Sequence, residues 1–195
     1  RYSVDEEWLV PHFEKMLYDQ ALLTRVYLHA YLVLGEARWK QVVEETVDYV
    51  LRELRHPSGG FFSAEDADSP DEHGHGHEGL FHTWTSDEVR DVLGADADTA
   101  LDWYEFTEGG NFEGRTIPAR LKHRGELIRP PDVESARQRL FDARALRRRP
   151  LLDNKVLTEW NGLMLASLAE AAAALDRPDW LDAAVANGRF LVDNL

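Results

Sequence analysis

The stretch ARWKQVVEETVDYVLREL, Ala37–Leu54, has a counterpart later in the chain, PDWLDAAVANGRFLVDNL, Pro178–Leu195. The two align without a gap, with Trp39 opposite Trp180 and Leu54 opposite Leu195. Apolar residues recur in the first stretch every three or four positions, which predicts an amphipathic helix. Because self-similarity at a distance indicates a repeated architecture, the alignment predicts a fold built of repeated helices.

An apolar helix is expected before each copy. The first is predicted over roughly His12–Leu34 and the second within LLDNKVLTEWNGLMLASLAEAAAAL, residues 151–175. In the register of the repeat, Leu22 and Leu23 fall on Leu163 and Met164. A nearly apolar helix followed by an amphipathic one is typical of two concentric layers. We therefore predict an all-α fold, a partial toroid of helical hairpins.

An irregular insertion separates the two copies. Residues 60–84 are predicted to be a long loop with short β-like pieces near Phe61–Ser63 and Leu80–Trp84. A short helix follows, capped by Thr85 or Ser86 with Glu88 placed for a capping box, and another is expected at residues 96–107. A basic amphipathic helix is predicted from about Asp132 to Arg149, where Pro150 stops it. Since the chain does not begin with Met, we expect residues 1–195 to be a fragment of one toroid domain.

Composition limits the functions available. The formal net charge is −14, with 22 Lys and Arg against 36 Asp and Glu, and binding of nucleic-acid phosphates needs basic residues. No apolar run approaches the roughly 20 residues of a membrane span. The absence of cysteine excludes disulfides, thiolate metal sites and cysteine nucleophiles within these residues. We expect a cytoplasmic protein that has neither nucleic-acid nor membrane partners.

Polar residues gather where the predicted hairpins place one rim of the toroid. Antiparallel helices bring the start of an inner helix beside the end of the preceding outer helix. Three groups meet that condition: residues 12–19, the stretch SAEDADS (63–69) and LDNKVLTEWNG (152–162); EGGNFEGR (108–115) is a possible fourth. Carboxylates, amides and aromatic rings in one cleft suit a hydroxyl-rich, sugar-like small molecule. The candidate catalytic residues are His12, Asp19, Asp66 and Glu159, and the candidate ligand-binding residues are Glu14, Lys15, Tyr18, Glu65, Asp68, Asp153, Lys155, Trp160 and Asn161.

Alternatives remain open at this rim. Glu14, Lys15 and Asp19 could cap the helix and pair with neighbours, with His12 a packing residue. Sugar epimerisation needs a base such as His12 or His82 and a second acid, whereas glycoside hydrolysis needs two carboxylates about 5–10 Å apart. The stretch AEDADS lacks the spacing of a calcium loop, and HGHGHEG (73–79) is interpreted as a solvated loop. No metal and no cofactor are expected.

Four motifs resemble a known family. They are RYSVDEEWLVPHFEKMLYDQALL (1–23), GGFFSAEDADS (59–69), EGLFHTWT (78–85) and DNKVLTEWNGLM (153–164). They are similar to the spermatogenesis-associated-protein-like family, whose bacterial members are described as highly conserved proteins containing a thioredoxin domain. The resemblance implies an N-terminal thioredoxin-like domain followed by an (α/α)6 toroid similar to N-acylglucosamine 2-epimerases and six-hairpin glycosidases. It also implies that the thioredoxin-like domain and the C-terminal hairpins are absent from these residues.

Two functions follow from these expectations. The first is a carbohydrate-active toroid, with a sugar epimerase, isomerase or glycosidase-like activity if it is an enzyme. The second is a non-catalytic toroid that binds a ligand or protein and works with the thioredoxin-like domain of the same full-length chain. The first predicts that the polar rim residues point into one cavity, and the second predicts that ion pairs and helix caps use them up.

Overall fold

The computed structural model describes residues 2–194 and has an all-α fold with a few short strands. The chain divides into two compact units. Residues 14–66 and 152–194 form what we call the helix-pair unit, and residues 2–13 and 67–151 form the insertion unit. Within the part described, no helix is long and apolar enough to cross a membrane.

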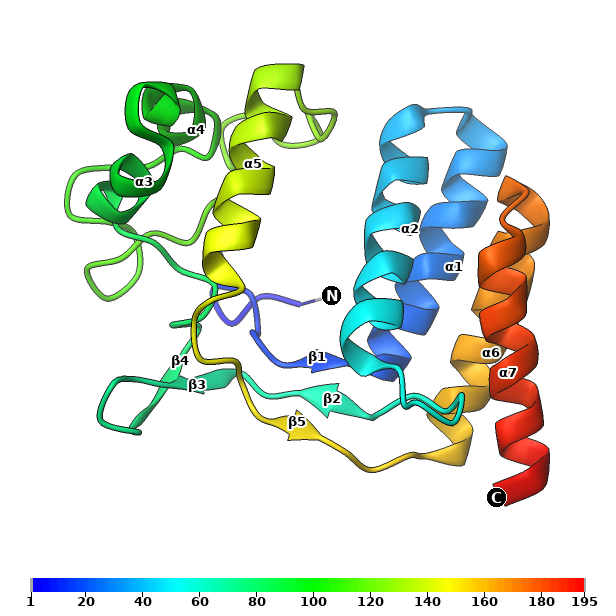
Figure 1. The fold of residues 1–195 in the computed structure, drawn as a ribbon. Coiled ribbons are helices and arrows are strands. Elements are labelled where there is room, and N and C mark those ends of the chain that lie inside the picture. Colours follow the sequence, from blue (N-terminus) through cyan, green and yellow to red (C-terminus); the bar gives the residue numbers. More distant parts are fainter. Residues whose placement is uncertain (1, 195) are drawn as a thin grey trace. The chain divides into compact units, whose positions relative to one another are not determined.

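Two helical hairpins make up most of the helix-pair unit (Figure 1). Helices α1 (Leu17–Leu34) and α2 (Ala37–Tyr49) form the first, and α6 (Thr158–Leu175) and α7 (Pro178–Asn194) form the second. Helix α1 packs against both α2 and α6, and α6 packs against α7. The predicted hairpin repeat is confirmed, while closure into a toroid remains a prediction. Helix α2 ends in a π-helical turn, Val50–Leu54.

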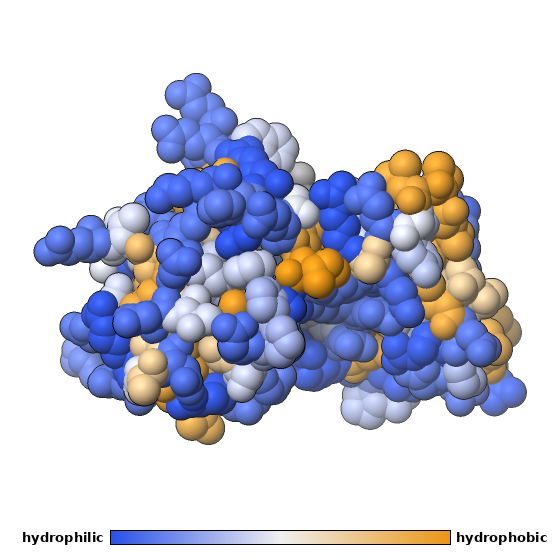
Figure 2. Space-filling view, turned by 90° about the horizontal axis from the view of Figure 1, so that it is seen from above, coloured by the Kyte–Doolittle hydropathy of each residue, from blue (hydrophilic) through white to orange (hydrophobic). Residues whose placement is uncertain are grey.

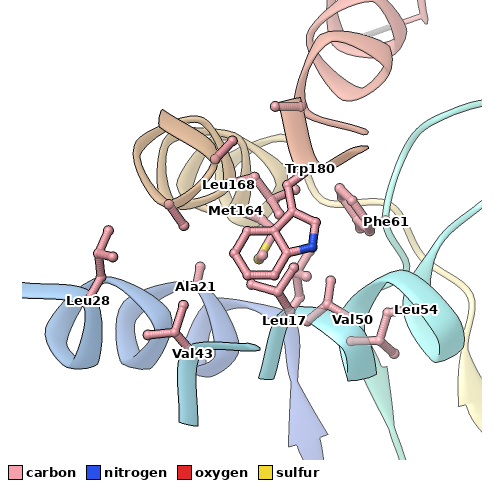
Figure 3. Packing of buried hydrophobic residues seen from close by; sticks show 14 residues of the cluster. Leu17, Ala21, Leu28, Val43, Val50, Leu54, Phe61, Met164, Leu168 and Trp180 are labelled. Carbon is pink, nitrogen blue, oxygen red and sulfur yellow. The ribbon is translucent and has the colours of Figure 1, made fainter. Parts of the chain in front are cut away.

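The apolar core of this unit lies between the two hairpins (Figure 3). Trp180 is fully buried, and its indole projects among Leu17, Met164 and Phe61. A hydrogen bond of 2.8 Å from the Ser167 hydroxyl to the Ala21 carbonyl ties α6 to α1. The repeat is not symmetric in its packing, because Trp39, the counterpart of Trp180, is only half-buried. Its ring stacks on Tyr27 instead, with centroids 5.5 Å apart.

A small antiparallel sheet lies where α1 and α6 begin. Its strands are β1 (Lys15–Met16), β2 (Ala64–Glu65) and β5 (Leu152–Asp153), in the order β1-β2-β5. The register places Lys15 opposite Glu65 and Ala64 opposite Asp153. The prediction of a helix from His12 was therefore wrong at its start, because Lys15 and Met16 give their backbone groups to β2 and α1 begins at Leu17. The later helix likewise begins only at Thr158.

The insertion unit combines a β-hairpin with short helices. Its elements are β3 (Asp68–Pro70), β4 (Gly76–Glu78), α3 (Ser86–Leu93), a 3-10 turn (Gly94–Asp96), α4 (Ala97–Trp103) and α5 (Pro131–Arg144). Val89, Leu93 and Leu140 contribute to its own small core. The predicted capping box is confirmed: the Thr85 hydroxyl accepts from the Glu88 N–H at 3.1 Å, and the Glu88 carboxylate accepts from the Thr85 N–H at 2.8 Å.

Two predictions in the insertion were wrong in position. The strands do not lie at Phe61–Ser63 and Leu80–Trp84, since Phe61 and Trp84 each form only one isolated bridge, to Arg55 and Thr116. Helix α5 ends at Arg144 rather than Arg149. Beyond its end, the guanidinium groups of Arg147 and Arg148 donate to loop carbonyls of residues 71–83. Arg147 and Arg148 make these bonds from outside the helix.

Candidate functional site

A buried carboxylate lies where α1 begins. Glu65 on β2 is only 3% exposed, and two groups face it. The Lys15 ammonium lies 3.8 Å from its Oε2, and the Tyr49 hydroxyl donates to the same oxygen at 3.2 Å. The strand register sets Lys15 and Glu65 directly opposite each other, which is the arrangement that favours cross-strand ion pairs. We call Lys15, Tyr49 and Glu65 the carboxylate cluster.

An aromatic pair lies at the first turns of α1 and α6. The rings of Tyr18 on α1 and Trp160 on α6 have centroids 4.8 Å apart and are tilted by 60°. Both side chains are half-buried. Tyr18 follows Lys15 by three residues, so the aromatic pair and the carboxylate cluster share the same end of α1. Aromatic faces beside charged and hydroxyl groups make a surface with both apolar and polar character.

Asp153 and Lys155 form a second, separate ion pair. The Lys155 ammonium lies 2.9 Å from Asp153 Oδ2. This hydrogen bond lowers the pKa of Asp153 below its usual range, so the carboxyl is ionised at neutral pH. Because successive strand residues point to opposite faces, Asp153 opposite Ala64 lies on the other face of the sheet from Glu65. The sheet therefore divides the predicted ligand-binding residues between two faces.

Asn161 has a structural role in the first turns of α6. It is fully buried, and its Oδ1 accepts from the Phe61 N–H at 2.7 Å and from the Asn187 amide at 2.9 Å. Its Nδ2 donates to the carbonyls of Phe61 and Leu157, both at 3.0 Å. Two donors and two acceptors are the full capacity of an Asn amide. Groups of the chain itself therefore make all the hydrogen bonds of Asn161 that were expected to hold a ligand.

The other predicted residues fall into two groups. Within the helix-pair unit, Glu14 and Asp19 are half-buried, whereas Asp66 and Glu159 are exposed. His12 and Asp68 belong to the insertion unit. There the His12 ring meets Tyr2 edge-on at 5.0 Å, and Asp68 is an exposed residue of β3. The catalytic and ligand-binding roles assigned to these residues remain predictions.

Among residues 2–194, no group of three or more His, Asp or Glu side chains is arranged to hold a metal ion. In the acidic stretch 63–69, Glu65 turns toward Lys15 and Tyr49. In the histidine-rich stretch 73–79, His77 on β4 lies 3.2 Å from Asp71 Oδ2, and His75 just before β4 lies 3.6 Å from the same oxygen. Both histidines are exposed.

Tyr49 was missed by the sequence analysis. It lies within the amphipathic pattern of residues 37–54, where it reads as an ordinary helical residue. Only the position of β2 against the end of α2 reveals that its hydroxyl reaches Glu65. A partial signal was available, because a tyrosine near the rim end of an outer helix lies close to the polar groups expected at that rim.

The fold and the cluster define a helical-hairpin protein with a buried, hydrogen-bonded carboxylate where α1 begins. No family model matches the chain. It is similar to spermatogenesis-associated protein 20 of Homo sapiens, at 38% identity over 98% of this chain, and to that of Mus musculus, at 37% over 98%. An uncharacterized protein of Caenorhabditis elegans is 32% identical over 100% of the chain. These similarities bear out the resemblance to spermatogenesis-associated proteins, while the thioredoxin-like domain that the resemblance implies remains a prediction.

The chain spans about 28% of the length of the human and mouse relatives and 31% of the nematode one. Among solved structures, a crystal structure of D-mannose isomerase aligns with 89% of this chain and 40% of its own. The sequence identity is 16% and the TM-score is 0.29, a score that does not establish a common fold.

Proposed function

We propose that the helix-pair unit binds a sugar-like, hydroxyl-rich small molecule where α1 and α6 begin, as part of a sugar epimerase- or isomerase-like protein. The observation that supports this proposal best is the burial of Glu65 against Lys15 and Tyr49. A carboxylate withdrawn from water beside a lysine and a phenol is the kind of grouping that active sites use for proton transfer. The Tyr18–Trp160 pair supplies apolar faces at the same end of α1.

The proposed chemistry needs proton removal from a carbon and proton return. Glu65 acts as the base, because an ionised carboxylate accepts a proton. Tyr49 and Lys15 carry protons that can be given back to a substrate oxygen or carbon. The sugar ring packs its C–H face on Tyr18 or Trp160 while its hydroxyls bond the polar groups. His12, Asp19, Asp66 and Glu159 remain candidate catalytic residues in this scheme.

A second function has specific support. Lys15 is paired with Glu65, Lys155 with Asp153, and Asn161 is occupied by protein groups. Such mutual pairing is the pattern expected of a non-catalytic unit. In this alternative the helix pairs bind a ligand or protein together with a thioredoxin-like domain of the full-length chain.

A thermal-shift screen of the full-length protein against mono- and disaccharides tests the proposal. A sugar that binds only the folded protein raises its stability, by about 2.7 kcal/mol at 100 times its dissociation constant. The shift should disappear in Trp160→Ala. In Glu113→Gln, a change at an exposed residue of the insertion unit, it should be retained.

Catalysis is tested separately by incubating each binding sugar in D2O and following deuterium uptake by NMR. Exchange at the carbon next to the carbonyl should fall about 100-fold or more in Glu65→Gln, while the sugar-induced thermal shift persists. A thermal shift with no deuterium uptake would support the non-catalytic function. If no sugar shifts the melting temperature and none takes up deuterium, the carbohydrate proposal is wrong.

A further inference from the structure

The insertion unit contains a large cavity that the proposed function does not use. Its volume is about 730 Å³, and it is lined by the start of α3, by Leu101 of α4 and by part of the segment 106–116. This segment includes EGGNFEGR (108–115), the possible fourth group of the predicted rim. The structure places that stretch in the insertion unit, where it contributes to this cavity instead.

Hydroxyl groups are frequent in the cavity wall. The residues that carry them are Thr85, Ser86, Thr107 and Thr116. The Thr107 hydroxyl donates to the Gly110 carbonyl at 3.3 Å and keeps its capacity to accept. Because a hydroxyl can both donate and accept a hydrogen bond, such a wall suits a ligand whose own groups also do both.

Thr116 is the most deeply buried of these four residues, at 1% exposed. Its backbone exchanges two hydrogen bonds with Trp84, at 2.7 and 3.0 Å. Among residues 2–194, no group forms a hydrogen bond with its hydroxyl. A buried hydroxyl without a partner costs stability. Thr116 therefore supplies a polar group that a ligand in the cavity can satisfy.

The charges of the wall disfavour an ionic ligand. Asp87 and Glu108 line the cavity, and their carboxylates repel an anion. Arg90 also lines it and lies 3.3 Å from Asp87. This guanidinium and the positive end of the α3 dipole, at Ser86, repel a cation. A neutral ligand avoids both repulsions.

The loop in the wall is held in one conformation by its own contacts. Asn111 exchanges two hydrogen bonds with Ile117, at 2.8 and 3.1 Å. Gly110 approaches Arg115 so closely that a Cβ would lie 2.2 Å from the Arg115 carbonyl oxygen. At Gly109, by contrast, a Cβ would meet no atom within 4 Å. The loop thus offers accessible backbone groups and needs little reordering when a ligand binds, which favours affinity.

We propose that this cavity binds a short, neutral oligosaccharide. The sugar hydroxyls bond to Ser86, Glu108 and Thr116, and a C–H face of one ring packs on the half-buried Phe106. An aromatic face beside well-placed polar groups is a usual composition of a small-molecule site. The volume is within the roughly 300–1,000 Å³ of such sites, with room for more than one ring. The cavity lies wholly within the insertion unit, so this proposal is independent of the sugar site described above.

Calorimetric titration of the full-length protein tests this assignment, with maltotriose, cellotriose and triacetylchitotriose as probes. The three differ in linkage and substituents but are all neutral and rich in hydroxyls. We expect at least one of them to bind, and its disaccharide to bind at least about fivefold more weakly because it reaches fewer groups of the wall. Inorganic phosphate and spermidine, an anion and a cation, should bind at least about tenfold more weakly than that trisaccharide.

Two variants locate the bound oligosaccharide. Glu108→Ala should weaken its binding at least about tenfold. Glu113→Ala is the matched control, since Glu113 is an exposed glutamate of the same loop that does not line this cavity. Thr116→Val should weaken binding about fivefold while the melting temperature stays the same or rises, because the change removes a buried hydroxyl without a partner. Circular dichroism verifies that each variant is folded.

The proposal is overturned if none of the three trisaccharides binds, or if phosphate or spermidine binds more tightly. It is also overturned if binding survives both Glu108→Ala and Thr116→Val unchanged. Binding that is lost in Trp160→Ala but kept in Glu108→Ala would place the oligosaccharide in the helix-pair unit. That outcome would contradict this assignment and support the proposed function, so the two proposals can fail separately.

Discussion

Different interactions stabilise each of the two units of this chain. In the helix-pair unit, long helices bury a continuous apolar cluster that includes Leu17, Trp180 and Phe61. In the insertion unit, short helices bury a smaller cluster, and arginine side chains bind the loops together. The surfaces differ as well: apolar residues (orange in Figure 2) gather over the helix pairs, where Val26, Val33 and Val185 are exposed. Burial of apolar area stabilises one unit, and directed polar bonds stabilise much of the other.

Glu88 is the centre of the polar arrangement. Its carboxylate accepts from Arg115 at 2.6 Å and from Arg147 at 3.3 Å, besides capping α3. Arg147 also donates to the carbonyls of Phe81 and Thr83, and its burial lowers the pKa of its guanidinium. Such a network is directional, so it fixes the loop geometry that a small apolar core leaves free.

The largest effect is expected from Trp180→Ala. Removing a fully buried indole leaves a cavity in the core of the helix-pair unit, and such changes cost about 3–5 kcal/mol of unfolding free energy. Hydrogen exchange should accelerate in α1, α6 and α7 more than in α3 and α5. Urea denaturation of the same variant measures the loss in free energy.

Leu181→Ala is the matched control, because Leu181 is the next residue and is 49% exposed. It should change the unfolding free energy by less than about 1 kcal/mol. Equal acceleration of exchange in both units of Trp180→Ala would contradict the comparison, since it would mean that the two units unfold as one.

Glu88→Ala should have a medium effect on stability, and this effect should fall mainly on the insertion unit rather than on the helix-pair unit. The change removes the capping box and leaves two guanidinium groups without this carboxylate. Since the Glu88 side chain is 39% exposed, we expect a loss of only about 1–2 kcal/mol. Exchange should accelerate in α3 and α5 while α6 stays protected. Asp87→Ala is the control, because this side chain on the same helix is 92% exposed; it should change neither the unfolding free energy nor the exchange rates. If α3 stays protected from exchange in Glu88→Ala, the polar network is dispensable.

The smallest effect concerns acid. Hydrogen bonds from Arg137 and Arg129 lower the pKa of Glu134 in the folded insertion unit below its ordinary value of 4.5. A lowered folded-state pKa gives stability that is present above pH 4.5 and is lost as the pH falls through the folded-state value. Glu134→Gln should therefore lower the melting temperature at pH 7. At a pH below the folded-state pKa of Glu134, the variant and the unmodified protein should have the same melting temperature. With a partly exposed pair the difference is below about 1 kcal/mol, and a constant difference at every pH would contradict this assignment.

The sequence predicted the long helices better than the short strands, for a physical reason. Apolar periodicity reports burial on one face of a helix, so α2, α6 and α7 were evident, as was the repeat that relates Trp39 to Trp180. Strands of two residues carry no periodicity, and β1, β2 and β5 were not predicted.

The candidate sites follow the same division. Lys15 and Glu65 were identified as polar residues near one rim, but their pairing depends on a strand register that no local pattern encodes. The contact of Tyr49 with Glu65 likewise depends on a segment distant in the sequence. Asn161 shows the converse: a polar residue at a helix start suggested ligand binding, and the structure places it in a buried hydrogen-bond network.

The same buried asparagines have a consequence for synthesis on the ribosome. Asn187 donates to the carbonyl of Gly59, which is 128 residues earlier in the chain. At roughly 5–20 residues per second, about 6–26 s pass between the translation of the two partners. During that interval α1 and α2 can form, but the loop that leads into β2 lacks its partners, and Leu17 and Phe61 lack the apolar groups of α6 and α7. The apolar side chains of the nascent first hairpin therefore lack part of their packing until the second hairpin emerges and completes the core.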